Sequence, residues 1–226
     1  MNPLDSIVSS INLILKGDRE LFGIVFLSIK LSFIATTIST ILSLPISLMI
    51  TQYEFIGKKI IITIINTLMA LPTVVVGLLV YSLLSRNGPL GCLSLLYTPY
   101  AMVIGQVILI SPIITGLLIS SISLLDIRVK KEAIALGANK FQVMAVIFEE
   151  GRQGFVSAII CGFGRVFAEV GISMMVGGNI ASYTRNIPTA IALETSKGNF
   201  AHSFALGLIL LFVAFIINPL FHYLRK

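Results

Sequence analysis

The stretch from Tyr100 to Ser123, YAMVIGQVILISPIITGLLISSIS, decides the fold class of this chain, because it contains no charged residue. A helix needs about 20 largely apolar residues to cross the hydrocarbon core of a bilayer. The stretch lacks the alternation of polar and apolar residues that is typical of barrel strands. Only helices and closed barrels satisfy every backbone group in lipid, so this stretch predicts a membrane-spanning helix.

The composition of the whole chain extends this prediction. The 226 residues are 56% hydrophobic and only 12% charged, with a mean hydropathy of +1.00. Soluble globular domains are closer to ~50% apolar and ~25% charged. We therefore expect a single all-α integral membrane domain over residues 1–226, with the lipid bilayer as its solvent.

Five apolar runs predict five membrane-spanning helices. Four of the runs contain an internal proline, which a membrane helix tolerates where neighbouring helices satisfy the freed carbonyl groups. The runs cover about 28–50, 60–84, 100–123, 155–176 and 204–224.

The distribution of Lys and Arg predicts the orientation, since basic residues are enriched in cytoplasmic loops. With the N-terminus outside and the C-terminus inside, the inner segments carry nine basic residues and the outer segments five. The net charge of +6 is explained in this way, and nucleic acid is not an expected partner. Lys30 lies within the first run, where we expect it to reach the outer headgroups.

The segment over residues 1–20 has an amphipathic pattern. Its apolar side chains share one helical face, and the start of the chain has no basic region or cleavage site of a removable signal peptide. Two interpretations are equally favoured: a helix on the outer membrane surface, or a helix packed against the flank of the bundle. The apolar positions are Leu4, Ile7, Val8, Ile11, Ile14 and Leu15.

The connection over residues 124–154, on the predicted inner side, alternates charged and apolar residues at helical spacing. Gly137 is expected to break it into two short helices. Its apolar residues predict a face that meets protein or membrane; they are Ala133, Leu136, Phe141, Met144 and Ile147.

Within this connection, the residues KEAIALGA from Lys131 to Ala138, with Ile147 ten positions after Gly137, resemble the cytoplasmic EAA loop of ATP-binding-cassette (ABC) importer permeases. Lys131 and Glu132 stand where that family usually has Glu and Ala. The resemblance implies a coupling helix that docks in a groove of a separate ATPase subunit. The expected contact residues are Glu132, Ala133, Leu136, Gly137, Ala138, Phe141 and Ile147.

The resemblance extends over most of the chain from the first run onward. TLMALPTVVVGL (67–78) and GFGRVFAEVG (162–171) resemble the oxyanion branch of the family, and TRNIPTAIALE (184–194) is most similar to tungstate permeases, with molybdate permeases next. It implies a type I importer fold in the cytoplasmic membrane and import of an oxyanion, tungstate first, with molybdate or another anion such as sulfate as the alternatives. The implied partners are a second copy of the permease, two ATPase copies and an extracytoplasmic solute-binding protein.

The sequence itself also indicates that the energy for transport comes from a partner protein. No Gly-x-x-x-x-Gly-Lys-Ser/Thr phosphate loop occurs, so we expect no bound cofactor and no ATP hydrolysis by this chain. Cys92 and Cys161 lack metal-ligand spacing, and no metal site is expected. An ion-coupled secondary carrier is a rival function, but it is built from repeated halves, which this sequence lacks.

The fourth run carries two charges one helical turn apart, Arg165 and Glu169. The pair is either an internal ion pair that neutralises itself or a pore-facing arginine that favours a dianionic oxyanion. Small residues recur on the same run and predict close packing, either within one subunit or between two. These packing residues are Cys161, Gly164, Ala168 and Gly171, and Gly177, Gly178 and Asn179 either shape the pore mouth or end the helix.

Overall fold

The computed structural model describes residues 9–14 and 18–224; of residues 127, 140 and 217–224 it describes the backbone alone. Within these ranges the chain forms helices and no strand, which confirms the predicted all-α class. The elements are α2 (Arg19–Gln52), α3 (Lys58–Met69), α4 (Thr73–Leu84), the 3₁₀ turn η1 (Gly91–Leu93), α5 (Pro99–Ser123), α6 (Ile127–Ala135), α7 (Lys140–Phe167), α8 (Gly171–Gly177), α9 (Ile187–Ser196) and α10 (Phe200–Leu224).

Side chains at the helix starts explain where several elements begin. The Asp18 carboxylate accepts a hydrogen bond from the Glu20 N–H at 3.0 Å and caps α2. Thr98 caps α5, whose first residue is Pro99, a position where proline costs no hydrogen bond. Asn139 and Gln142 form a reciprocal capping box at the start of α7.

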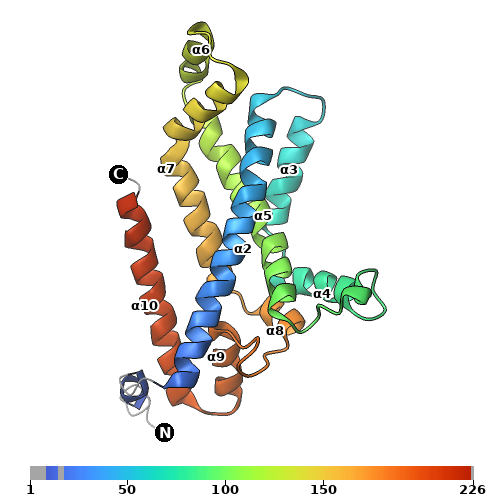
Figure 1. Cartoon of the computed structure of the whole chain (residues 1–226), viewed down its shortest axis with the longest axis vertical. Coiled ribbons are helices and arrows are strands. Elements are labelled where there is room, and N and C mark those ends of the chain that lie inside the picture. Colours follow the sequence, from blue (N-terminus) through green and yellow to red (C-terminus); the bar gives the residue numbers. More distant parts are fainter. Residues whose placement is uncertain (1–8, 15–17, 225–226) are drawn as a thin grey trace.

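The helices α2, α3, α5, α7 and α10 run along the long axis of the molecule, with α6 at one end and α8 and α9 at the other (Figure 1). We call these the α6 end and the α9 end. α2 and α5 are each long and apolar enough to cross a membrane, and the pairs α3–α4 and α7–α8 pass the same test as bent units. Residues 200–216 of α10 form a shorter apolar helix.

The predicted second span over 60–84 is wrong as one continuous helix. α3 and α4 meet at an angle of 99°, so α4 leaves the bundle sideways (Figure 1). The break lies at Leu71 and Pro72, where Pro72 adopts an extended conformation. A proline has no N–H to donate and its ring collides with the preceding turn, so the helix restarts at a new angle.

The fourth predicted span, 155–176, is also wrong as one helix. α7 begins earlier, inside the predicted loop, and a bend of 56° separates α7 from α8. The sequence reasoning missed α9 entirely, because its ten residues are too few for a span. Both short helices, α8 and α9, lie at the α9 end (Figure 1).

α2 and α5 form the central helix pair. A row of buried serines and one threonine on α2 replaces bulky side chains, which lets the helix backbones approach closely. The Ser43 hydroxyl donates to the Ser111 carbonyl of α5 at 3.1 Å. The row consists of Ser28, Ser32, Thr36, Ser39, Ser43 and Ser47.

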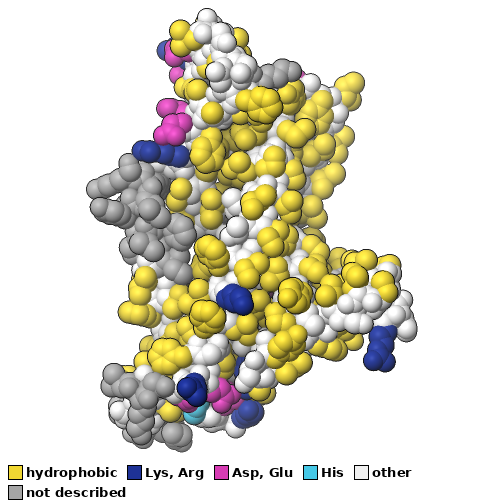
Figure 2. All heavy atoms as spheres, viewed as in Figure 1, with side chains coloured by type: hydrophobic (Ala, Val, Ile, Leu, Met, Phe, Trp, Pro, Cys, Tyr) yellow, Lys and Arg dark blue, Asp and Glu magenta, His cyan; other side chains and the backbone are white. Residues whose placement is uncertain are grey.

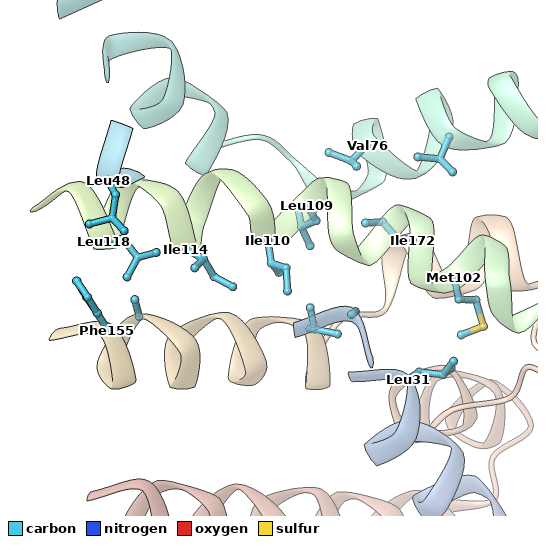
Figure 3. Packing of buried hydrophobic residues seen from close by; sticks show 14 of the residues in the cluster. Leu31, Leu48, Val76, Met102, Leu109, Ile110, Ile114, Leu118, Phe155 and Ile172 are labelled. Carbon is cyan, nitrogen blue, oxygen red and sulfur yellow. The ribbon is translucent and has the colours of Figure 1, made fainter. Parts of the chain in front are cut away.

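Apolar side chains of α5 fill the space toward α7. Ile110, Ile114 and Leu118 point from α5 toward α7, where Phe155 closes the cluster (Figure 3). All four are nearly inaccessible to solvent. On the outside, hydrophobic side chains cover the middle of the visible face, and charged side chains gather mainly toward its two ends (Figure 2). This distribution suits a protein whose middle lies in lipid.

The described part of the amphipathic N-terminal segment, residues 9–14, is helical. The buried Ser10 hydroxyl donates to the Ala201 carbonyl at the start of α10 at 3.0 Å, and Ile14 packs against the second apolar cluster of the molecule. This part therefore lies against the flank of the bundle. Leu4, Ile7, Val8 and Leu15 lie outside the described residues.

Candidate functional site

The loop over 124–154 forms an elbow at the α6 end. α6 ends in a Schellman motif: the Gly137 N–H donates to the Ile134 carbonyl and the Ala138 N–H to the Ala133 carbonyl, both at 3.0 Å. Gly137 has φ +84°, a left-handed conformation that side chains with a β-carbon rarely adopt. Gly137 thus divides the segment as predicted, but only α6 is short; the second helix, α7, continues to Phe167.

The predicted coupling residues fall into two groups in the structure. Ala133 and Ile147 are buried, 8% and 5% exposed, and together with Val143 they hold α6 against α7. They are positioning residues and are not available for contact with another protein. Ala138 is half-buried at the inner side of the elbow.

The other group is open to the surroundings. Leu136 is 89% exposed and Phe141 83%, on either side of the Gly137 turn, and Ile134 is 54% exposed. Glu132 is exposed beside them. We call Ile134, Leu136 and Phe141 the elbow patch. Large apolar side chains exposed together on a polar segment are typical of a surface that binds another protein.

One residue of the elbow contacts another long helix. Lys130 Nζ of α6 donates to the backbone carbonyl of Gln52, the last residue of α2, at 3.3 Å. The sequence reasoning missed this contact, because a backbone carbonyl 78 positions away gives no signal in the sequence. Near this contact, Lys58 Nζ donates a hydrogen bond to the Glu54 carboxylate at 2.8 Å, and this bond is the main reason that the pKa of Glu54 lies below its usual value. The positive charge of Lys130 lowers that pKa by a smaller amount.

The second region is the bend between α7 and α8, near the α9 end. Arg165 Nη1 lies 3.4 Å from Glu169 Oε2, so the expected ion pair is present. Glu169 lies beyond the end of α7, is 2% exposed, and its other oxygen accepts the Ile172 N–H of α8 at 3.2 Å. Arg165 is 43% exposed. Glu169 therefore joins the two helices, while the guanidinium group remains open to the outside of the chain.

Replacing Glu169 with leucine is expected to destabilise this bend. The change leaves the Ile172 N–H without its acceptor in a buried place, a loss of about 1–3 kcal/mol, and leaves Arg165 without its counter-charge. We expect a lower unfolding temperature in detergent, measured by loss of the monodisperse chromatographic peak after heating. Glu169→Gln keeps an acceptor oxygen and should lose less; equal losses in the two variants would contradict this role.

Three of the predicted small residues at the end of α7 do not pack against the described part of the chain. Cys161, Gly164 and Ala168 are exposed together with Arg165, and an added β-carbon at Gly164 would meet no atom of the described residues within 4 Å. The alternative of close packing inside one subunit is therefore wrong for these three. Gly171 differs, since a β-carbon there would lie 2.9 Å from the Thr73 hydroxyl of α4. We call Cys161, Gly164, Arg165 and Ala168 the open face of α7.

The Gly177-Gly178-Asn179 stretch ends α8. Gly178 has φ +68°, and its N–H donates to the Met174 carbonyl at 3.2 Å. A β-carbon at Gly177 would lie 2.8 Å from the sulfur of Met102, so α5 and α8 are in close contact. Asn179 Nδ2 donates to the Thr189 carbonyl of α9 at 3.4 Å. The stretch thus terminates a helix and links it to its neighbours.

Two residues that the sequence reasoning missed, the buried Ser28 and the partly buried Arg185, tie the α9 end together. The Ser28 hydroxyl of α2 accepts the Ile187 N–H, at the start of α9, at 2.7 Å. Arg185, just before α9, pairs with Glu20 of α2 at 3.3 Å. The serine spacing on α2 was visible in the sequence, but its partners were not.

Comparisons with known proteins agree with this architecture. No family model matches the chain. The chain is 37% identical over 96% of its length and 96% of the relative's length to the "Tungstate uptake system permease protein TupB" of Peptoclostridium acidaminophilum. It is 38% identical, over 88% of each chain, to the "Probable anion ABC transporter permease protein" of Haloferax volcanii.

A solved structure shares the fold. It is a chain of a bacterial ABC transporter involved in the import of the acidic polysaccharide alginate, with a TM-score of 0.77 at 17% identity over 94% of this chain and 81% of that one. At this identity the likeness concerns the fold alone. With the two relatives above 30% identity over nearly their whole length, the helical architecture and the elbow lead to one conclusion: the chain belongs to the family of ABC transporter permease proteins that includes the tungstate uptake permeases.

Proposed function

We propose that this permease subunit imports tungstate through the cytoplasmic membrane, driven by ATP hydrolysis on a separate protein. The main support for tungstate as the substrate is the sequence identity of 37% to a tungstate uptake permease over 96% of both chains. The motifs at 67–78, 162–171 and 184–194 support the same branch of the family. Molybdate, which shares the charge and tetrahedral shape of tungstate, is the alternative cargo.

The proposed topology has five spans, namely α2, the bent pairs α3–α4 and α7–α8, α5, and α10. The N-terminus lies outside and the C-terminus inside, which places the α6 end in the cytoplasm. The excess of Lys and Arg in the segments on that side supports this orientation. The working assembly is a homodimer with two ATPase copies and an external solute-binding protein.

The elbow patch is the proposed docking surface for the ATPase. Its apolar side chains stand free, while Ala133 and Ile147 fix α6 on α7 from behind. When two ATPases close on nucleotide, a docked α6 moves with them, and α7 follows because it packs against α6. The bundle then rocks between inward-open and outward-open states.

The open face of α7 is proposed to line the interface between the two copies and the anion path. The half-exposed Arg165 supplies positive charge there, and its pairing with Glu169 limits the strength of anion binding. Weak binding suits a path, since the anion must leave it as well as enter it. Gly177, Gly178 and Asn179 sit at its outer end, where the close contacts of α8 set the width of the mouth.

The test is elemental analysis of cells that lack this chain and of cells in which it is restored. Each strain is offered trace tungstate or trace molybdate, with the ATPase and binding-protein genes intact. Restored tungstate accumulation, with molybdate little affected, is the expected result. If molybdate alone depended on the chain, the alternative cargo would replace tungstate. Uptake of both anions without the chain would contradict the proposal.

A further inference from the structure

We propose that Lys130 is a coupling residue that links α6 directly to the inner end of α2. The inference rests on the proposed function, because it concerns how ATPase movement reaches the transport path. Its basis is the hydrogen bond from Lys130 Nζ to the Gln52 carbonyl, which joins the elbow to the helix that ends there.

The last turn of α2, at its inner end, has no positive charge of its own. The last turn of α2 contains no basic residue, and its terminal carbonyl groups have no partners within the helix. A cation at a helix C-terminus is favourable, since the aligned peptide dipoles concentrate negative charge there. Lys130 supplies this cation from α6: it donates to the Gln52 carbonyl and is also attracted by the Glu54 carboxylate just beyond the helix.

Pockets adjoin this hydrogen bond on two sides. Two cavities, each about 330 Å³, share Lys130 and Gln52 among their lining residues. One extends toward Ile62 of α3 and Ile119 of α5, the other toward Met144 of α7. Among the described helices α6 packs mainly on α7, so its hydrogen bond from Lys130 to the end of α2 is a link outside that packing.

α2 can carry a movement from one end of the molecule to the other. Its 34 residues extend over roughly 50 Å at 1.5 Å per residue. At the far end it is fixed to α9 by the Ser28–Ile187 hydrogen bond and the Glu20–Arg185 ion pair. A displacement of α6 can therefore reach α9 through α2, which also packs against α5 and α7 along its length.

The neighbouring Lys131 provides a matched control. It is exposed, and its side chain makes no hydrogen bond or ion pair with any residue that the structure describes. The variants are Lys130→Met, Lys131→Met and Lys130→Arg, each expressed as the full chain with its ATPase and reconstituted in vesicles. The readouts are co-purified ATPase, tungstate uptake, and ATP hydrolysed in the presence of tungstate-loaded binding protein.

We expect Lys130→Met to bind the ATPase normally and to lose about tenfold in tungstate transported per ATP, the order of one lost charge-assisted hydrogen bond. Lys131→Met should behave as the wild type, and Lys130→Arg should restore most of the loss because it keeps a charged donor. Normal transport per ATP in Lys130→Met, or an equal loss in Lys131→Met, overturns the proposal.

Two further outcomes are decisive. If Lys130→Met no longer assembles with the ATPase while Lys130→Arg does, Lys130 is a structural residue and the coupling role is refuted. If the wild-type chain itself binds no ATPase, it is the proposed function that fails. The two failures are thus distinguished by the wild-type sample in the same experiment.

Discussion

A permease in which Gly137 is replaced by glutamate is expected to fold but to lose its ATPase. Gly137 has φ +84°, which costs a residue with a β-carbon roughly 1 kcal/mol. The new carboxylate would also stand between Leu136 and Phe141, in the middle of the elbow patch. Burying an unpaired charge against an apolar groove is far more costly than the strain. We expect co-purification of the ATPase to fall to background.

Gly198→Glu is the matched control for this experiment. Gly198 also has a left-handed conformation, with φ +75°, is exposed, and an added β-carbon there has no atom within 4 Å in the described part of the chain. It lies between α9 and α10, at the opposite end of the bundle. This variant should carry the same strain and the same charge but retain the ATPase. Equal loss in both variants, or normal association of Gly137→Glu, would show that the elbow patch is not the docking surface.

A second large effect is expected from leucine at Gly164. Within one chain the change is harmless, because the site is open and leucine favours a helix by about 1 kcal/mol over glycine. If the open face of α7 packs against a second copy, the added side chain collides with it. Overpacking costs about 1–3 kcal/mol in each copy, so we expect monomers and background tungstate uptake.

The measurements are the molar mass of the purified permease in detergent, by light scattering, and tungstate accumulation by cells. Gly23→Leu is the control: Gly23 lies on α2, is exposed, and an added β-carbon there likewise meets no described atom within 4 Å. It should leave mass and uptake unchanged. A dimer of normal stability with Gly164→Leu would exclude the open face of α7 from the interface between copies.

The sequence predicted the elements that depend on local information. The run at 100–123 became α5 within one residue, since a long uncharged stretch has only one stable form in lipid. The Gly137 turn was equally local, because a left-handed glycine acts on its own helix end. The resemblance to the permease family rested on the sequence of this same segment, from Lys131 to Ile147.

The predicted continuous helices failed at Pro72 and at residues 168–170 for different reasons. A proline in a membrane helix either kinks it or ends it, and the angle of 99° depends on what α4 packs against, namely α8. At the second break, Glu169 satisfies the Ile172 N–H and so replaces a backbone bond that the continuous helix would have made. Hydropathy contains neither piece of information.

By itself, the sequence predicted that this protein is helical and suited to a membrane, because the length and apolarity of its runs are properties of the chain. Only the tertiary structure decided which side of each helix packs against another helix and which side stays exposed. It buried Ala133 and Ile147, left Leu136 and Phe141 free, opened the small-residue face of α7, and brought Lys130 to the end of α2. The physical reason is that a helix repeats every 3.6 residues whatever surrounds it, so the pattern gives its faces but not the neighbour that covers each one.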